Sequence, residues 1–394
     1  MVGRSTAAVR RQSGCEAALS NSEQTPGRPV AARPPDRIHS ERAPPAPYGS
    51  SVTARAGFVD ALLTAPVGVM LVGLLEAEVR NSYPLPSKSD PDAVLEAAEA
   101  VRSRSFGSLV ALAVDASSHM TPWNMDVAAM VAAAYRDAGA RLPIAKAIEE
   151  RFGIDLHQPL DRAGQQWWQS DNSVESRAPE PGHRPFSEVY GAGQFTWAGL
   201  WTVTNPPPEA HRCLANSWEM YPRPLSRWRL PVRSGAHIVE IHRPDDWSAL
   251  VTRYPAPARA GEEWWELPGR HQDAESVAGL MAIPHQRAAR TSIRQHLVPD
   301  WGLVAADHDG IHLSWAGFLT SEGCITDLGD GDVAMLRYWF SERTHWLTDP
   351  FGTPEPLDAP HIDEDRSDFG GVDVRRDSAR RARDLQALKV QLGR

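Results

Sequence analysis

The densest group of side chains with acid–base or metal-binding chemistry is Asp307-His308-Asp309, with His312 close behind it. Carboxylates and imidazoles at this density can bind a divalent metal, and a histidine alone can transfer protons. An Asp-Gly pair before a strand is also ordinary turn chemistry, and His308 and His312 would point differently across the junction. We therefore predict a plain turn and no metal site, with His312 as a candidate catalytic residue beside a ligand cleft.

A strand predicted at residues 310–318 would position that histidine. Ile311, Leu313 and Trp315 alternate there with His312 and other smaller or polar residues. The alternation predicts one face in the core and the other, with His312, facing the cleft.

Common signatures of active sites are missing from the sequence. There is no GxxxxGK[ST] phosphate loop, no complete GxGxxG fingerprint, no HExxH and no GxSxG. The run at 327–332 looks like a calcium loop, but its alternate ligand positions fall on Gly329 and Gly331. We predict a turn there as well.

The stretch Gly199-Leu-Trp-Thr202-Val-Thr204 is followed by a predicted helix. It resembles the second-strand motif of arginine–serine–glutamate ADP-ribosyltransferases, in which hydroxyl groups support a nicotinamide pocket. Residues 236–244 are similar to the next strand of that family. The acidic run from Glu262 to Glu266 is similar to a turn whose glutamate stabilises positive charge in the transition state.

The resemblance implies a transferase-like enzyme that uses NAD or a nucleotide. Glu263 or Glu266 would then be catalytic, Thr202 and Thr204 would bind the cofactor, and Arg184 would stand for the family's arginine.

The sequence also departs from the family pattern. Val203 occupies the middle of the hydroxyl triplet, and the strand predicted at 310–318 follows the supposed last glutamate.

The alternative is a non-catalytic protein that binds another protein through tryptophan-rich surfaces. Eleven of the fourteen tryptophans lie between Trp197 and Trp346. Large aromatic side chains at strand spacing are also typical of a core or a domain interface. Whether the partner is a small molecule or a protein stays open.

Composition and periodicity predict an α+β protein in which a helical bundle precedes a tryptophan-rich mixed domain. We expect a disordered arm at 1–51, a helical domain at 52–168, a linker at 169–185, an α+β domain at 186–349, and a polar tail with a short basic helix at 350–394.

Proline in the first turn marks four helix starts in the helical domain, at Pro66, Pro91, Pro122 and Pro143. Gly153 is expected to end the last of these helices. In the second half, alternation predicts strands at 194–204, 226–232, 236–242, 310–318, 333–340 and 345–348, and helices at 208–220, 245–254 and 276–293.

Charge, cysteine content and hydropathy argue against several classes of partner and of structural site. A net charge of −9 and a pI near 5.9 argue against broad binding to nucleic acid or anionic membranes. Three widely spaced cysteines without a CxxC motif predict neither a disulfide framework nor a cysteine zinc site. The most apolar run, 65–75, is too short to span a membrane. We expect a soluble, cytoplasmic protein without a signal peptide.

Overall fold

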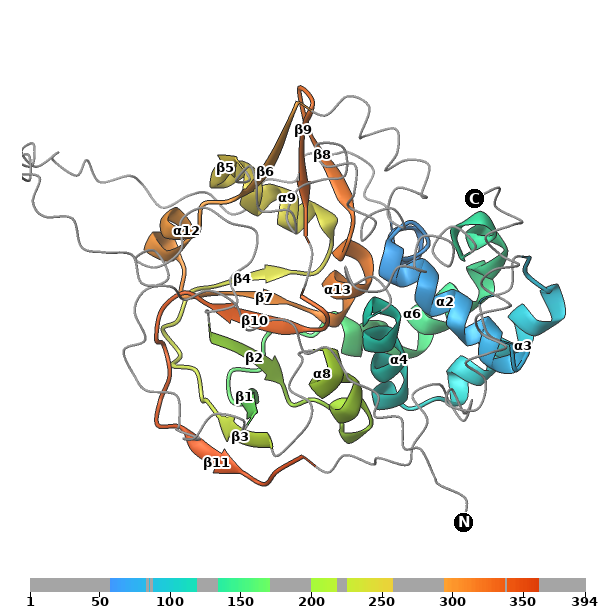
Figure 1. Cartoon of the computed structure of the whole chain (residues 1–394), viewed down its shortest axis with the longest axis horizontal. Helices are drawn as coiled ribbons and strands as arrows, with labels where there is room; N and C mark the ends of the chain where they lie inside the picture. The colour runs from blue at the N-terminus through green and yellow to red at the C-terminus, as the bar shows by residue number, and fades with distance from the viewer. Residues whose placement is uncertain are drawn as a thin grey trace, which may run out of the picture. The chain divides into compact units, whose positions relative to one another are not determined.

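The computed structural model describes residues 57–82, 85, 88–118, 134–170, 200–217, 225–257, 294–336 and 339–360. All of them belong to one compact unit, Ala54–Arg394. Helices dominate its N-terminal part and strands its C-terminal part, so the fold is α+β, as predicted (Figure 1).

Three described helices in the N-terminal part begin where proline predicts, and α1 (Phe58–Leu62) and α4 (Phe106–Ser118) begin without one. The other helical segments are α2 (Pro66–Val79), α3 (Pro91–Ser103), the 3-10 turn η1 (Ala138–Arg141) and α6 (Leu142–Leu156). Proline occupies the first turn of α2, α3 and α6, where its missing N–H breaks no hydrogen bond. Pro122 lies outside the described residues.

Helix α6 does not stop at Gly153, so that prediction is wrong. The helix continues to Leu156, and both Phe152 and Leu156 are buried. Burial of these two side chains outweighs the helix-weakening effect of one glycine, which is about 1 kcal/mol.

A seven-stranded sheet follows, with the strand order β11-β3-β1-β2-β10-β7-β4. The strands are β1 (Gln165–Ser170), β2 (Leu200–Thr204), β3 (Leu225–Arg229), β4 (Ile238–Ile241), β7 (Gly310–Leu313), β10 (Arg343–Trp346) and β11 (Glu355–Leu357). Neighbouring strands are antiparallel except for β4 and β7, which are parallel. Strands distant in sequence therefore lie side by side (Figure 1).

A smaller sheet has the order β5-β6-β9-β8. Its strands are β5 (Pro255–Pro257), β6 (Gln295–Pro299), β8 (Ile325–Gly329) and β9 (Asp332–Met335). The connecting helical segments are η2 (Pro208–Ala210), α8 (His211–Ser217), α9 (Pro244–Arg253), α12 (Trp301–Asp307) and α13 (Trp315–Ser321).

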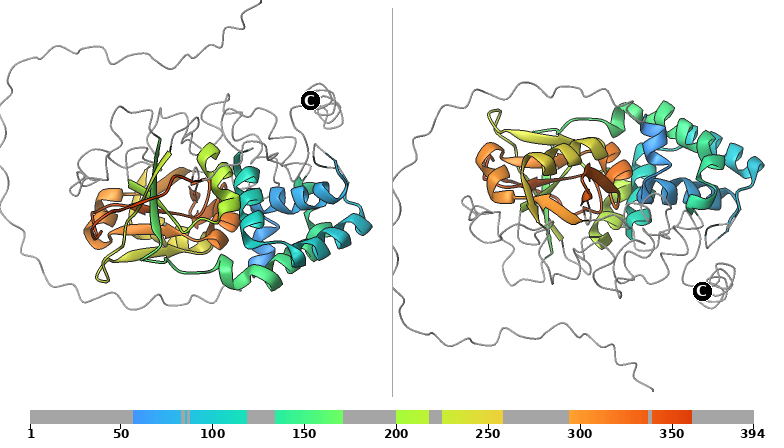
Figure 2. Two further views of the ribbon diagram at one scale, coloured as in Figure 1. Left: turned by 90° about the horizontal axis from the view of Figure 1, so that it is seen from below. Right: turned by 90° about the horizontal axis from the view of Figure 1, so that it is seen from above.

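The two faces of the large sheet have different neighbours. One face contributes Val203, Ile311 and Leu313 to a large cluster that also holds the buried side chains of α2, α4 and α6. The other face contributes Trp346 to a small separate cluster. Helices and sheet share one core, so the predicted boundary at 169–185 does not separate two cores. Figure 2 shows these helices beside the strands in both views.

The predicted strand at 310–318 is only half a strand. It ends at Leu313, and α13 begins directly after Ser314, whose side chain accepts a hydrogen bond from the Gly317 N–H. A Cβ on Gly317 would lie 2.2 Å from the Ile241 carbonyl oxygen, so glycine lets α13 approach β4 closely. The Ser314 N-cap and the close approach of Gly317 to Ile241 therefore favour a helix here, although Trp315 continues the alternation typical of a strand.

Residues 165–168 were expected to be helical, but they belong to β1. Gln166 pairs with Val203 of β2 on one side and with Arg229 of β3 on the other. A central strand gains pairing on both sides, which no local pattern reveals.

The predicted tail at 350–394 is wrong in its described part, because Glu355–Leu357 forms β11 and pairs with β3 at the edge of the large sheet. The other predictions agree better with the structure where it describes them. Strands β2, β3, β4, β9 and β10 and helices α8 and α9 overlap predicted elements. The turn at 327–332 is confirmed as the β8–β9 connection, with positive φ at Gly329, Asp330 and Gly331. Residues 1–51, 276–293 and 375–392 lie outside the described parts. Among the described helices, none has the length and apolar character needed to cross a bilayer.

Candidate acid–base site

Four polar side chains cross the large sheet in one line. Register pairs Glu240 of β4 with His312 of β7, His312 with Thr344 of β10, and Thr344 with Thr202 of β2. Residues directly opposite each other on neighbouring strands share a face of the sheet. We call Glu240, His312, Thr344 and Thr202 the polar row.

The polar row is buried at its centre and partly open at one end. His312 is 2% exposed and Thr344 is fully buried, whereas the Glu240 side chain is 29% exposed. Every residue of β7 is buried, so His312 does not lie on an open face as the alternation predicted. Elements packed on both faces of the strand enclose it.

Glu342, just before β10, joins the polar row from its buried side. The Thr204 hydroxyl donates to Glu342 Oε1 at 2.6 Å, and the Thr204 N–H donates to Oε2 at 3.0 Å. His312 Nδ1 lies 3.5 Å from Glu342 Oε1 and 3.1 Å from the Thr344 hydroxyl. The carboxyl group is thus fixed against one imidazole.

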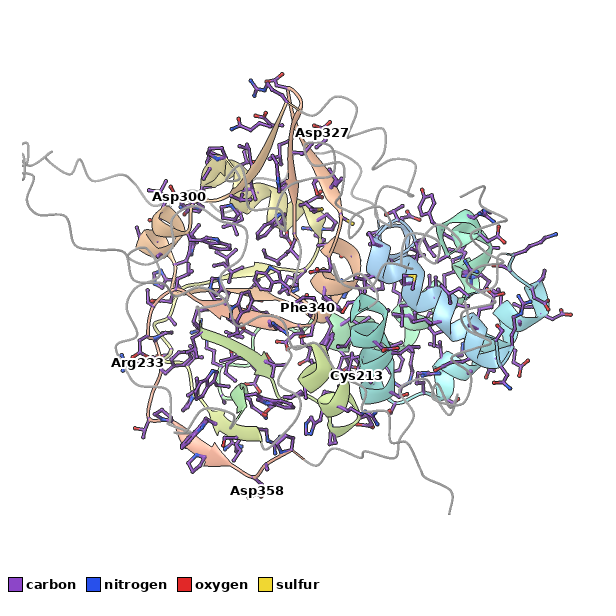
Figure 3. The ribbon with its side chains drawn as sticks, viewed as in Figure 1. Cys213, Arg233, Asp300, Asp327, Phe340 and Asp358 are labelled. Carbon is purple, nitrogen blue, oxygen red and sulfur yellow. The ribbon has the colours of Figure 1, made fainter. Side chains whose placement is uncertain are left out.

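The backbone that carries Glu342 is unusual at Phe340. This residue has φ of 64°, a left-handed conformation that is rare for a bulky side chain. The Ser117 hydroxyl of α4 donates to the Phe340 carbonyl at 3.2 Å, and the Trp339 N–H donates to Glu322 Oε2 at 3.2 Å. Figure 3 labels Phe340 where the strands meet the helices. These contacts hold the segment that delivers Glu342.

Burial shifts the protonation equilibria of this cluster. It raises the pKa of Glu342 to about 8, against the Thr204 hydrogen bonds that favour the ionised form. Burial also raises the pKa of Glu240 to about 7. The pKa of His312 falls to about 3, first through burial and then through its proximity to His242. Near pH 7 the proton of the Glu342 and His312 pair therefore resides on the carboxyl group, and their contact is not an ion pair.

The open end adds a second imidazole. Glu240 Oε2 lies 3.7 Å from His312 Nε2 and 3.9 Å from His242 Nε2, and this buried oxygen has no hydrogen-bond partner among the described residues. His242 Nδ1 is 2.9 Å from the Ser314 hydroxyl, and its side chain is 29% exposed. Burial is the main cause that lowers the pKa of His242.

Titratable groups thus run from the interior to the surface. The order is Glu342, His312, Glu240 and His242, with successive separations of 3.5, 3.7 and 3.9 Å. These separations exceed hydrogen-bond length by less than 1 Å, so small side-chain movements would allow proton transfer.

Thr202 supports the polar row from its far end. Its hydroxyl donates to Gln165 Oε1 at 2.5 Å and accepts from Trp346 Nε1 at 2.7 Å. Gln165 Nε2 in turn donates to the Thr204 hydroxyl at 2.7 Å. The two threonines predicted to bind a cofactor therefore belong to one hydrogen-bond network with Glu342.

The structure places only part of the predicted site. His312 and Thr202 lie in the polar row, and Thr204 contacts Glu342 directly. The other predicted site residues, Glu263, Glu266 and Arg184, lie outside the described residues.

The sequence reasoning missed three titratable members of the site. Glu240 and His242 stand two positions apart on a predicted strand, a spacing that places both on one face and could have indicated them. Glu342 carried no signal, because it precedes the strand predicted at 345–348.

The acidic turn forms separate local contacts. The Tyr254 hydroxyl and the Arg253 guanidinium donate to Asp307 Oδ2, and the His237 N–H donates to Asp309 Oδ2 at 2.8 Å. These bonds are those of an ordinary turn that links neighbouring elements. Within the described ranges, no group of three or more His, Cys, Asp or Glu side chains is arranged to hold a metal ion.

Comparisons with protein-family models, with characterised proteins and with solved structures find no match, so the chemistry of this chain is inferred from its own site.

Proposed function

We propose that this chain is an enzyme whose acid–base centre is the pair Glu342 and His312, linked to solvent by Glu240 and His242. The observation that carries this proposal is the environment of Glu342. Its carboxyl group is buried, its hydrogen-bond donors are the hydroxyl and N–H of Thr204, and its pKa is raised to about 8. A carboxyl group retained in such a place at neutral pH can act as a general acid.

Each member of the chain of groups has a distinct role in this proposal. Glu342 donates a proton, and His312, which is neutral near pH 7, accepts one. Glu240, with a pKa of about 7, exchanges protons with both imidazoles. His242 is partly exposed and returns protons to solvent. Values close to the working pH suit this exchange, because both protonation states are then populated.

The proposed reaction is transfer of a group from NAD or a nucleotide, with NAD as the cofactor. Thr204 supports this choice, because its hydroxyl orients the one described carboxyl group that it contacts, Glu342. A cationic nicotinamide ring near Glu342 would lower its pKa, so the carboxyl group would release its proton toward solvent by way of Glu240 and His242 when NAD binds. The carboxylate then stabilises the positive charge that develops as the bond between nicotinamide and ribose breaks and nicotinamide leaves. His312 accepts the proton of the nucleophile that attacks the ribose.

The test is NAD turnover by the full chain, measured as release of nicotinamide. Glu342→Gln and His312→Ala should each reduce the rate about 100-fold or more, since general acid–base groups typically contribute that much. Glu355→Gln is the matched control, because Glu355 forms an exposed pair with Arg229 at 3.2 Å, away from the polar row.

Two results would contradict the proposal in different ways. Unchanged turnover in Glu342→Gln would remove the acid–base assignment while leaving NAD as substrate. Absence of turnover, together with no thermal stabilisation by NAD or nucleotides, would remove the substrate. A ligand at 100 times its dissociation constant should stabilise the fold by about 2.7 kcal/mol.

The alternative of a protein-binding surface has less support among the described residues. The exposed large hydrophobic side chains there are Leu95 on α3, Ile154 on α6 and Leu303 on α12. Single apolar side chains on separate helices are normal for a soluble surface and do not form a docking patch.

A further inference from the structure

A short exposed segment covers the polar row. Residues 157–164 connect α6 to β1 without forming a helix or strand, and we call the first seven of them, 157–163, the strap. Five of these seven residues are exposed, whereas Leu160 and Arg162 are partly buried. His312, which lies beneath the strap, is 2% exposed. A nearly inaccessible imidazole is therefore shielded in part by residues that face water.

The strap contacts the polar row through its backbone. The Leu160 N–H donates to Glu240 Oε1 at 3.1 Å. A hydrogen bond between the His312 imidazole and the backbone of Gln158 raises the pKa of the histidine against the stronger effect of burial. A bond that favours the protonated ring is accepted by the backbone, so the Gln158 group is its carbonyl. The strap thus offers a backbone carbonyl to His312 and a backbone N–H to Glu240.

Polar contacts at Asp161 and Arg162 hold the strap in place. The side-chain amides of Asn205 and Gln165 donate to the Asp161 carboxylate at 2.9 Å and to its carbonyl at 3.0 Å. Arg162 donates from Nη1 to the Arg233 carbonyl and from Nη2 to the Ala236 carbonyl, both at 2.9 Å. The Val232 N–H donates to the Arg162 carbonyl at 2.8 Å, and Leu160 packs on the small cluster. Figure 3 labels Arg233 on the outer side of the sheet. Segments with exposed backbone and little buried apolar surface open at low free energy.

We infer, building on the proposed acid–base site, that the strap occupies a site that binds amide groups. A ligand must displace the strap to reach this site. A replacement must offer His312 an acceptor and Glu240 a donor, as the strap does. An amide group supplies both in one plane. Two sources carry this chemistry, the carboxamide of a small molecule such as nicotinamide and the backbone of a peptide.

The first experiment asks whether the strap opens. Hydrogen exchange of the unaltered protein should be faster at residues 157–163 than at β4 and β7. Diethyl pyrocarbonate, which acylates neutral imidazoles, should modify exposed His157 much faster than His312. In Arg162→Ala, His312 should react at least about tenfold faster, because two hydrogen bonds from a charged group are lost. Arg229→Ala, whose side chain pairs with exposed Glu355, should leave the rate unchanged.

The second experiment tests the ligand class on Arg162→Ala. Nicotinamide should slow acylation of His312, whereas nicotinic acid, which lacks the N–H donor, should not. N-acetylalanine amide tests the peptide source in the same way, and the stronger protector identifies the source.

Two outcomes would overturn the inference. Either residues 157–163 exchange only with global unfolding, or neither amide protects His312 better than nicotinic acid does. Both readouts are independent of turnover, so they fail separately from the proposed enzyme activity.

Discussion

Glu76 of α2 and Glu342 before β10 are both buried carboxyl groups, but they have different partners. Glu76 Oε2 lies 2.7 Å from Arg141 Nε, with both side chains fully buried, and Glu76 Oε1 accepts from the Asp90 N–H at 2.9 Å. Glu342 instead meets Thr204 and a neutral His312. The first glutamate contacts its counter-charge directly, whereas the second contacts a hydroxyl, an N–H and a neutral imidazole, and the charge of neighbouring Arg343 lowers its pKa less than burial raises it.

This difference separates a structural role from a chemical one. The Glu76 and Arg141 pair ties α2 to η1 and to the start of α3, so it fixes how the helices pack. Such a pair requires both partners, because a single buried charge is strongly unfavourable. Glu342 avoids that penalty by holding a proton, which makes it available for transfer. Burial alone therefore does not mark a functional carboxyl group, and the identity of its partner does.

The largest expected effect is at the ion pair. Arg141→Ala should lower the free energy of unfolding by about 3–5 kcal/mol, because it leaves Glu76 buried without its guanidinium. Urea denaturation followed by circular dichroism measures this change. Arg102→Ala is the control, since its partners Glu99 and Glu150 are exposed, and it should change stability far less than Arg141→Ala does. If the two variants lost equal free energy of unfolding, the structural role assigned to the Glu76 and Arg141 pair would be wrong.

The next effect is a pH dependence that originates in the sheet. The folded-state pKa of Glu342 is about 8 and that of Glu240 about 7, both above the usual 4.5, so the stability they contribute is lost as pH rises through those values. His312, with its pKa lowered to about 3, contributes stability above pH 6.5 that is lost as pH falls toward 3. Above pH 6.5 only the carboxyl effect remains.

Between pH 6.5 and 8, stability should therefore fall by about 1.5–2 kcal/mol through Glu342 and by less than about 1 kcal/mol through Glu240, whose loss is nearly complete by pH 7. Denaturation midpoints across this range provide the measurement. Glu342→Gln keeps the shape of the protonated acid and should flatten the profile. A profile as steep as that of the unaltered protein would show that Glu342 does not titrate there.

The smallest effect concerns the hydroxyl that orients Glu342. Thr204→Val removes a donor to Glu342 and an acceptor for Gln165 without changing shape, and should cost about 1 kcal/mol. It should also raise the pKa of Glu342 further, because the Thr204 hydrogen bonds lower it. Infrared absorption of the protonated carboxyl group, followed against pH, reports this shift. Thr64→Val, whose hydroxyl bonds to helix carbonyls near the surface, should leave the Glu342 titration unchanged.

Local signals carried much of the fold. Asp90 followed by Pro91 predicts the start of α3, and the Asp90 side chain does accept from the Asp92 N–H. The glycines at 329 and 331 predict the turn between β8 and β9, because both have positive φ. These features were readable since each depends on residues a few positions apart.

The site needed contacts that no local pattern contains. Glu240 reaches His312 through parallel pairing of β4 and β7, and Thr202 reaches Thr344 across β10. The sequence predicted His312, Thr202 and Thr204 as site residues, but nothing in it indicated that Glu342 contacts them.

By itself the sequence determined the α+β class, the helix starts marked by proline, several strands and one member of the acid–base site, because propensity, capping and turn chemistry act over short distances. The tertiary structure decided that Glu342 and His312 meet and that burial moves their pKa values to about 8 and about 3. Register and desolvation depend on segments far apart in the chain, so only the folded molecule brings these groups together and sets where their proton resides.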